Sequence, residues 1–449
     1  MVGRKQFNAV AIAAIAASIG LVAPACAQQV TGQDATGDAI QTFAPDTNTI
    51  DSNTYDRGRN VSVLERPRPE YQAQGVQVGG FTVYPKLTAS GAYDDNIFAD
   101  PSGGPREGDF VFRVAPEVDF QSNWSRDSIS GYVRASQDEY AKFSTEDATQ
   151  YGAGLAGKLQ FGNSDLTGGV DYGHFVLPRS VSNNFGPSVH PLDYDYTAVS
   201  GQLATEFTRV RLSVRVDDET YWYHNGTTTL GAVVDDQDQN VNELYVTGKA
   251  EFAINADTAA YVLAKANEQT YQLNPPAVPF TKNSNGYEVD LGANLDLTHL
   301  LRGEVQLGYL QQDYVSPDFR TLDGLSGRME LLWFPTQLTT VTAVASRSVG
   351  DALIIGSSGF ITSDASLRVD HELLRNLILS ADGWYGFDQY NGVSRTDART
   401  GLDLQAEWLL NRHVGVSFAY DFSDQRSTGS AAGQSFDDNR GIISFVFQL

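Results

Sequence analysis

The chain has 449 residues, which is enough for two or three soluble domains or for one large barrel. Its formal charge is −24, and this acidic balance argues against nucleic acid or anionic lipid as a partner. Cys26 is the only cysteine, so the sequence excludes a fold held together by disulfide bonds.

Residues 1–27 have the features of a secretory signal peptide. Two basic residues precede an apolar run over residues 9–22, and Ala-Cys-Ala at residues 25–27 fits an A-x-A cleavage site. The apolar run is too short to span a membrane. We therefore expect the mature chain to begin at Gln28 and to lack cysteine; the alternative is a lipoprotein acylated at Cys26.

The next region, residues 28–80, is rich in Gln, Asp, Thr, Asn and Pro over most of its length and has few apolar residues. Such a composition cannot bury enough surface to fold alone, which predicts a flexible periplasmic N-terminal segment. The motif ERPRPEY at Glu65–Tyr71 is stiffened by proline and is expected to be extended.

From residue 81 to residue 449, apolar and polar residues alternate, as in β-strands whose successive side chains point to opposite faces. The C-terminal stretch RGIISFVFQL places four apolar side chains on one face: Ile443, Phe445, Phe447 and Leu449. The polar faces carry many charges, which suits a lipid-facing exterior and a wet interior better than a soluble sandwich with one shared core. The sequence therefore predicts an all-β fold, a transmembrane antiparallel up-and-down β-barrel over residues 81–449.

Counting the alternating segments gives about 18 strands, in line with the length of tilted strands that cross an outer membrane. Their expected centres lie near residues 88, 115, 132, 155, 170, 201, 215, 248, 263, 292, 308, 330, 343, 365, 382, 402, 418 and 445. Sixteen strands is the alternative, because Ala and Thr dominate the segments near residues 263 and 343.

The expected connections alternate between short and long, as in outer-membrane barrels with short periplasmic turns and long extracellular loops. The short ones are Asn123–Asp127, Gly162–Ser164, Asn255–Asp257, His299–Leu301, Pro335–Gln337 and Leu410–Arg412. The long ones are His174–Asp193, Asn225–Asn240, Gln272–Asn285 and Gln425–Asp438. This order predicts an outer-membrane protein with its N-terminal segment in the periplasm.

Two sets of residues are candidates for functional positions in such a barrel. Charged residues on the polar strand faces are expected to line the lumen, where they pair across neighbouring strands or create a field that selects solutes. These residues are Arg113, Glu117, Asp119, Arg134, Arg211, Arg215, Arg328, Glu330, Arg368, Arg399 and Glu407.

Tryptophans near the strand ends are expected to form aromatic girdles at the two membrane interfaces. These are Trp124, Trp333 and Trp408 at the short-turn end and Trp222 at the long-loop end.

Several motifs near the first strand are shared with a known family. They are the RPRPEY approach, Gly79-Gly80-Phe81, Tyr84-Pro85 and Tyr93-Asp94-Asp95-Asn96, followed later by Tyr314 and Trp333-Phe334-Pro335-Thr336. Through them, residues 63–449 resemble the putative β-barrel porin 2 family. The resemblance implies an outer-membrane barrel, and some members of the family accompany exopolysaccharide synthesis and export systems. It implies no catalytic residues.

No motif for catalysis, a cofactor or a metal stands out. The six histidines lack a spacing such as HExxH, and a serine nucleophile elbow has no strand-to-helix turn to occupy. Residues 94–96, Asp-Asp-Asn, are expected to form a turn after the first strand, with a calcium site as the alternative. Residues 235–238, Asp-Asp-Gln-Asp, are expected to be a solvated loop, with divalent cations bridging lipopolysaccharide as the alternative. We therefore expect no enzymatic activity and no cofactor.

Together these features predict a porin-like channel for polar solutes, with exopolysaccharide export as one specific use. A general or nutrient-uptake porin, and a structural or adhesive surface barrel with a blocked lumen, are the alternatives. The expected partners are outer-membrane lipid and lipopolysaccharide, the barrel assembly machinery and a polysaccharide substrate. A barrel of about 18 strands without a plug leaves an aqueous channel, and the acidic chain predicts weak cation selectivity that fades with salt.

Overall fold

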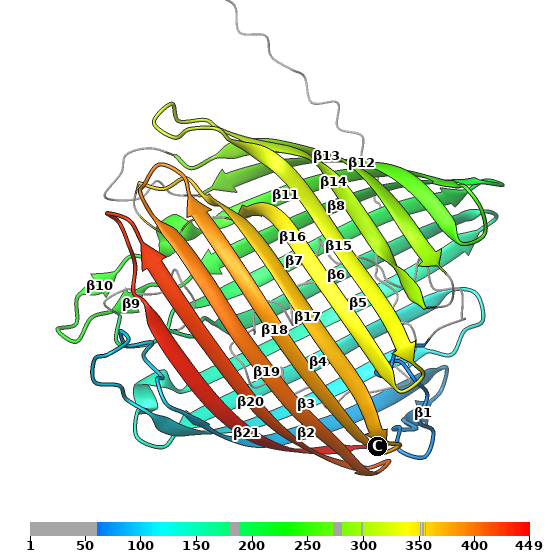
Figure 1. Ribbon diagram of the computed structural model, residues 1–449, viewed down its shortest axis with the longest axis horizontal. Helices are drawn as coiled ribbons and strands as arrows, with labels where there is room; N and C mark the ends of the chain where they lie inside the picture. The colour runs from blue at the N-terminus through cyan, green and yellow to red at the C-terminus, as the bar shows by residue number, and fades with distance from the viewer. Residues whose placement is uncertain are drawn as a thin grey trace, which may run out of the picture.

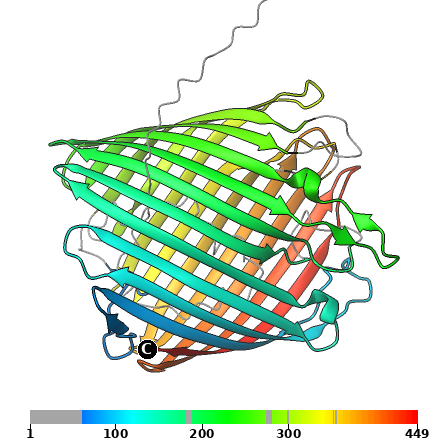
Figure 2. The same cartoon turned by 180° about the vertical axis from the view of Figure 1, so that it is seen from behind.

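The computed structural model describes residues 61–179, 188–272, 281–297, 300–350, 352, 354 and 356–449. The expected signal peptide, its cleavage site and the start of the N-terminal segment lie outside these residues. The described chain forms a closed antiparallel barrel of 18 long strands, shown in Figure 1 and from behind in Figure 2. Among the described residues we find no helix that is long and apolar enough to cross a membrane.

The barrel strands follow one another around the sheet in chain order. They are β2 (Phe81–Asp94), β3 (Asp109–Ser122), β4 (Ser128–Tyr140), β5 (Ala148–Phe161), β6 (Ser164–Val176), β7 (Asp193–Glu206), β8 (Val210–Tyr223), β11 (Val241–Ala253), β12 (Thr258–Tyr271), β13 (Ser284–Leu297), β14 (Leu301–Tyr314), β15 (Leu322–Thr336), β16 (Thr339–Gly350), β17 (Phe360–Leu374), β18 (Leu377–Tyr390), β19 (Thr396–Asn411), β20 (Val414–Thr428) and β21 (Phe436–Gln448). Each expected strand centre falls within one of these strands, and those near 263 and 343 lie in β12 and β16. The alternative of sixteen strands is therefore wrong.

The first and last long strands close the barrel. β2 pairs with β3 on one side and with β21 on the other, so that Leu87 lies opposite Phe447 and Ala89 opposite Phe445. Closure leaves no unpaired sheet edge among these strands, which a membrane-spanning sheet requires. The short strand β1 (Val76–Val78) pairs with the start of β2 and lies near the C-terminus at one end of the barrel (Figure 1).

The two ends of the barrel differ in their connections, as predicted. One end has short turns, such as residues 162–163 and 375–376, and the other has longer loops, such as residues 95–108 and 224–240. The loop 224–240 contains a small hairpin of β9 (Gly226–Thr227) and β10 (Val233–Val234), seen at the left of Figure 1, and a short 3₁₀ turn, η4 (Gln237–Gln239). A second 3₁₀ turn, η3 (Ser144–Glu146), lies between β4 and β5.

One predicted long loop is shorter than expected. The prediction for Gln425–Asp438 placed the loop over residues that belong to strands, because β20 continues to Thr428 and β21 begins at Phe436. Asp424 lies opposite Asp437 in this extension, so the ladder continues through residues whose polar composition indicated a loop. The long loop between β6 and β7 is described only in part, since residues 180–187 lie outside the described chain.

The alternation of side chains defines an outer and an inner face. On β3, Phe110, Phe112 and Val114 are each more than half exposed, whereas the side chain of Arg113 between them is 15% exposed. Contacts that skip a strand identify the inner face, because only the concave side of a barrel brings such side chains together. The hydroxyl of Tyr132 on β4 donates to Asp171 on β6, which places charged and polar residues inside.

Residues 61–80 differ from the flexible segment that was expected. They make hydrogen bonds and apolar contacts with the inner face near the short-turn end, from β14 to β21, and the backbone of Gly75 donates to Leu449. Their composition is too polar for a core of their own, as argued, but their charged residues find partners on the barrel wall. The rest of residues 28–80 lies outside the described chain.

Candidate functional site

The charged residues that were predicted to line the lumen all lie on the inner face. Each alternates along its strand with exposed apolar side chains. The set comprises Arg113, Glu117 and Asp119 on β3, Arg134 on β4, Arg211 and Arg215 on β8, Arg328 and Glu330 on β15, Arg368 on β17, and Arg399 and Glu407 on β19. The amphipathic strands thus bring residues nearly 300 positions apart onto one polar surface.

Ion pairs on this surface run along the wall. Arg113 lies opposite Asp138 in the strand register, and its Nε and Nη2 donate to the two carboxylate oxygens at 2.5 and 2.6 Å. Arg399 on β19 pairs with Asp388 on the neighbouring strand at 3.0 Å and reaches Asp364 on β17 at 3.1 Å. These ion pairs join separate strands and stabilise the inner face of the barrel wall.

Carboxylates outnumber cations on the inner face between β8 and β14. The carboxylates are Asp217, Glu219, Glu243, Glu251, Glu288, Asp290, Asp296 and Glu304, and the cations are Arg211, Arg215, Lys249, Lys265 and Arg302. Lys249 shows how the cations are shared, because its Nζ lies 3.2 Å from Glu304 and 3.5 Å from Glu251. This part of the inner face therefore carries more acidic than basic side chains.

The sequence reasoning missed aromatic residues on the inner face, among them Tyr132, Tyr261 and Trp384. Tyr132 lies under the guanidinium of Arg134, 3.9 Å from its ring centroid, and Tyr261 lies under Lys249 at the same distance. Trp384 on β18 donates from Nε1 to Asp403 at 3.2 Å. Each shares its strand face with charged residues, and that position is the signal that identifies them as lumen-facing.

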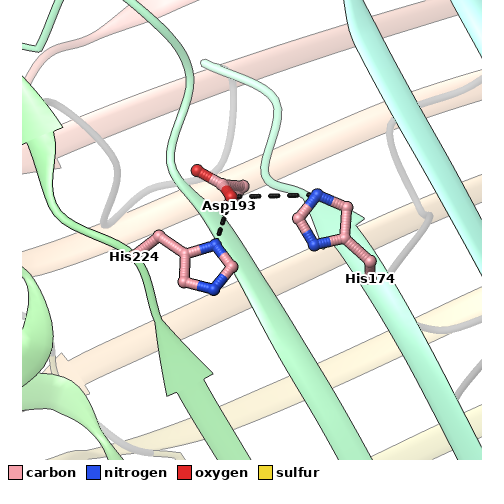
Figure 3. A group of neighbouring side chains, drawn as sticks. All are labelled: His174, Asp193 and His224. Atoms are coloured by element: carbon pink, nitrogen blue, oxygen red, sulfur yellow. Dashed lines mark hydrogen bonds and ion pairs between the residues drawn. The ribbon is translucent and has the colours of Figure 1, made fainter.

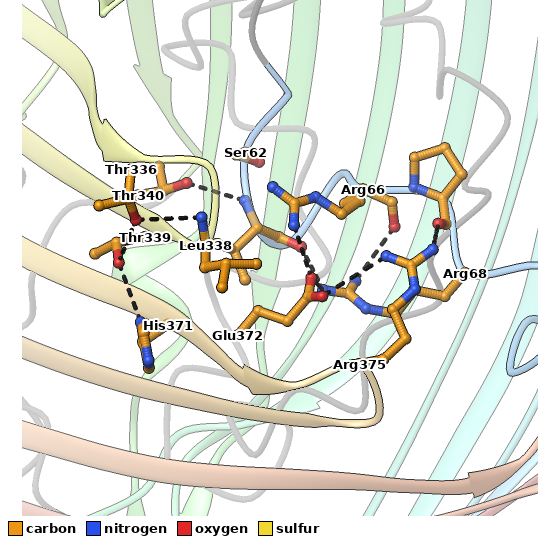
Figure 4. Close-up of polar contacts among 12 residues, drawn as sticks. Ser62, Arg66, Arg68, Thr336, Leu338, Thr339, Thr340, His371, Glu372 and Arg375 are labelled. Carbon is orange, nitrogen blue, oxygen red and sulfur yellow. Dashed lines mark hydrogen bonds and ion pairs between the residues drawn. The ribbon is translucent and has the colours of Figure 1, made fainter.

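The N-terminal segment is anchored at Glu372 on the inner face of β17 (Figure 4). Arg66 donates to Glu372 at 3.1 Å and Arg68 at 2.9 Å, and both Arg68 and Glu372 are almost fully buried. Burial lowers the pKa of the Arg68 guanidinium, and the neighbouring carboxylate of Glu372 opposes this shift. Separating a buried ion pair leaves each charge without its partner and costs free energy, so this contact holds the N-terminal segment against the wall.

Apolar contacts support the same anchor. Val63 is fully buried against Ile378 and Leu409 on the inner face, and its backbone N–H donates to Thr340 Oγ1 at 2.9 Å. Arg302 on β14 donates to Glu65 at 2.6 Å. The segment therefore follows the inner wall at the short-turn end and lines that mouth of the barrel.

The predicted girdle tryptophans lie on the outer surface. Trp124, Trp333 and Trp408 are about half exposed at the short-turn end, and Trp222 is 37% exposed at the long-loop end. Trp124 packs against Phe81, with ring centroids 5.7 Å apart. Two levels of outward aromatic side chains are what a barrel presents to the two interfaces of a bilayer.

The turn after the first strand has the predicted structure. The backbone N–H of Asn96 donates to Asp94 Oδ1 at 2.8 Å, and the backbone N–H of Asn439 donates to Asp95 Oδ1 at 2.9 Å. These carboxylates are thus engaged by backbone donors, as in a turn that caps a strand. In the loop 224–240, Asp236 accepts a hydrogen bond from the backbone of Gly226 at 3.3 Å.

The structure also joins residues that the sequence did not connect. His174 at the end of β6, Asp193 at the start of β7 and His224 just after β8 lie together at the long-loop end (Figure 3). The hydrogen bond with Asp193 raises the pKa of His224. Spacing along the chain did not reveal this group, because three different strands contribute it and only their register brings the side chains together.

A family comparison identifies the barrel. A model of the putative β-barrel porin 2 family matches residues 68–449. The chain belongs to this family. The match includes the second half of the anchored segment as well as the whole barrel, and porin-like barrels of this type are outer-membrane proteins that are typically not enzymes. A search of curated proteins gives no match.

This porin-family chain is also similar to solved structures from Pseudomonas aeruginosa. OccK2 (OpdF) in complex with glucuronate has 14% identity and a TM-score of 0.45, covering 82% of this chain and 98% of that one. OpdQ has 11% identity and a TM-score of 0.45, with coverage of 85% and 100%. The outer membrane protein opdK has 12% identity and a TM-score of 0.42, with coverage of 82% and 99%.

Proposed function

We propose that this barrel is an outer-membrane channel for polar solutes. The observation that carries the proposal is the closed 18-stranded wall, whose inner face is charged and whose ion pairs run along it. A barrel of this size holds an aqueous channel unless something fills it. By the usual topology, the short turns and the anchored segment face the periplasm, and the long loops face outside.

Ion conductance tests the channel function. The purified, folded protein is added to planar lipid bilayers, and single-channel currents are recorded in potassium chloride at several concentrations. We expect discrete conductance steps with a weak preference for cations at low salt. Folded protein that inserts but carries no current would reject the channel and favour a structural or adhesive surface barrel.

Within this function, we propose a carbohydrate as the solute, with exopolysaccharide export as the specific use. The support is the combination of planar aromatic faces and carboxylates on the inner wall, exemplified by Trp384 beside Asp403. Sugars present apolar C–H faces and hydroxyl groups, which match such surfaces. Uptake of nutrients is the competing direction. Genes for glycosyltransferases and chain-length control beside the gene of this protein would favour export, and their absence would favour uptake.

Current block by oligosaccharides tests the solute class. Neutral oligosaccharides of increasing length are added on one side of a bilayer that contains the channel, and the residence time of each blockade is measured. We expect Trp384→Ala to shorten the blockades several-fold. Trp408→Ala is the matched control, because Trp408 lies on the outer face and is expected to leave them unchanged. Equal effects of both variants, or no blockade at all, would reject the carbohydrate proposal while leaving the channel intact.

A further inference from the structure

Two histidines and two aspartates form a compact group on the outer face at the long-loop end of the barrel. In the strand register, His174 lies opposite Asp195, and Asp195 lies opposite Trp222. His174 has the same strand face as the exposed Tyr172, and Trp222 is exposed on β8. The group therefore lies outside the lumen, at the level of the aromatic side chains of that end.

Asp195 contacts one ring nitrogen of each histidine. Its Oδ1 lies 3.0 Å from His174 Nδ1, and its Oδ2 lies 3.3 Å from His224 Nε2. In a neutral imidazole, a hydrogen bond from one nitrogen to a carboxylate leaves the lone pair on the other nitrogen, so a metal can bind there in place of a proton. Asp195 thus orients both rings.

The opposite nitrogen of each ring faces Asp193. His174 Nε2 lies 3.8 Å from Asp193 Oδ2, and His224 Nδ1 lies 2.5 Å from the same oxygen. One ligand atom from each of these three residues lies within 4.8 Å of the other two. Figure 3 shows both rings turned toward the Asp193 carboxylate between them.

We propose that His174, Asp193 and His224 bind a divalent transition-metal ion, with zinc as the preferred metal. Two imidazole nitrogens and one carboxylate oxygen are a typical zinc ligand set, and a tetrahedral site leaves a fourth position for water or another ligand. Imidazole ligands favour zinc over calcium or magnesium, which prefer oxygen. In this site Asp195 is a positioning residue, the carboxylate behind the ligand histidines.

The surroundings restrict the positions of the ligands. The ring of Tyr151 stacks on His174 with centroids 5.2 Å apart and planes inclined by 18°. The backbone N–H of His224 donates to the carbonyl of Asp193 at 3.0 Å. A metal here joins the base of the loop after β6 to the base of the loop after β8, and so fastens two long loops at their root.

A cluster of protonated histidines and aspartates without metal is the competing explanation of these contacts, and metal titration separates the two. Tag-free, folded full-length protein in detergent is treated with a chelator, and zinc chloride is then titrated by isothermal calorimetry, with bound zinc counted by elemental analysis. We expect one zinc ion per chain. Absence of stoichiometric zinc binding by the wild-type protein would overturn the proposal.

Matched variants localise the site. We expect His174→Ala and Asp193→Asn to abolish stoichiometric binding. His371→Ala is the control, since His371 lies at the short-turn end and contacts Thr339, and it is expected to bind zinc as the wild type does. Wild-type affinity in either ligand variant would overturn the proposal. Because unfolding would also abolish binding, the folding of every variant is checked by the mobility of the folded barrel on unheated gels. His224→Gln provides a second, milder change of a ligand.

The role of Asp195 as a positioning residue is tested by a separate variant. We expect Asp195→Asn to weaken zinc binding by about 10- to 100-fold while keeping the one-to-one stoichiometry, as for other carboxylates behind metal-bound histidines. With cobalt in place of zinc, the variant is expected to keep the visible spectrum of a four-coordinate site. A changed cobalt coordination number in Asp195→Asn would show that Asp195 is a ligand and overturn its assignment as a positioning residue.

Discussion

Arg302 on the inner face of β14 donates a 2.6 Å hydrogen bond to Glu65, a residue 237 positions earlier in the chain. Arg302 is 1% exposed, so this guanidinium lies beneath the N-terminal segment, away from open solvent. The contact shows that the segment before β1 is part of the barrel mouth. It follows that changes in the segment affect the width and the charge of that mouth.

The first prediction concerns the anchor of this segment. Glu372→Gln removes the charge that Arg66 and Arg68 share, and breaking a buried pair of this kind typically costs about 3–5 kcal/mol. We expect the segment to detach, so that limited proteolysis cuts within residues 61–75 and single-channel conductance rises.

Glu70→Gln is the matched control for the anchor. Glu70 lies on the same segment and pairs at 3.2 Å with Arg375 in the turn between β17 and β18. Both side chains are nearly half exposed, so solvent screens the pair. We expect little change in proteolysis or conductance. Equal release of the segment by both variants would contradict the assignment of Glu372 as the anchor.

The second prediction concerns orientation in the membrane. An epitope inserted near Asp236, in the loop that carries the β9–β10 hairpin, is expected to bind antibody on intact cells. One inserted near Asn163, in the turn between β5 and β6, is expected to bind only after the outer membrane is permeabilised. Labelling at Asn163 alone on intact cells would show that the barrel has the opposite orientation in the membrane. The same prediction holds for Asn411 as an inside position, whereas Asn184 lies outside the described residues.

The third prediction concerns processing. We expect the protein purified from the outer-membrane fraction to begin at Gln28 and to contain no cysteine, since the A-x-A site ends at Ala27. Intact mass spectrometry measures this directly. A mass that fits a chain beginning with a lipid-modified Cys26 would support the lipoprotein alternative instead.

The fourth prediction concerns strand packing. A Cβ added at Gly308 on β14 would lie 2.0 Å from the carbonyl oxygen of Val289 on β13, and backbone cannot move aside easily. We expect Gly308→Ala to destabilise the barrel by about 1–3 kcal/mol, as overpacking does. Gly248→Ala on β11 is the control, because its Cβ meets nothing within 4 Å. Urea unfolding in lipid vesicles, followed by tryptophan fluorescence, compares the two.

The strands could be predicted because the membrane and the lumen impose a strict alternation. Even β12 and β16, where Ala and Thr dominate, were located, since their neighbours require a partner on each side. The ends of β20 and β21 were not located, because polar residues such as Asp424 and Asp437 are equally compatible with a loop and with a ladder that extends beyond the membrane.

The contacts between residues far apart in the chain could not be predicted from the sequence. The ion pair of Arg68 with Glu372 depends on where the N-terminal segment meets the wall, and polar composition alone indicated a free tail. The grouping of His174 with His224 depends on the register of three strands. A change of one residue in that register would turn a side chain to the opposite face.

The last prediction concerns ion selectivity and uses the pair of Arg113 and Asp138 on the inner wall. Arg113→Gln leaves an additional uncompensated carboxylate in the lumen, so we expect the reversal potential in a salt gradient to shift toward stronger cation preference. Asp138→Asn removes a carboxylate from the same pair and is expected to shift the reversal potential in the opposite direction. Both shifts should be clear near 0.1 M salt, where charges act over about 10 Å, and small at 1 M, where they act over about 3 Å. Shifts of the same sign in both variants, or shifts that persist at 1 M salt, would show that this pair does not act through the field in the lumen.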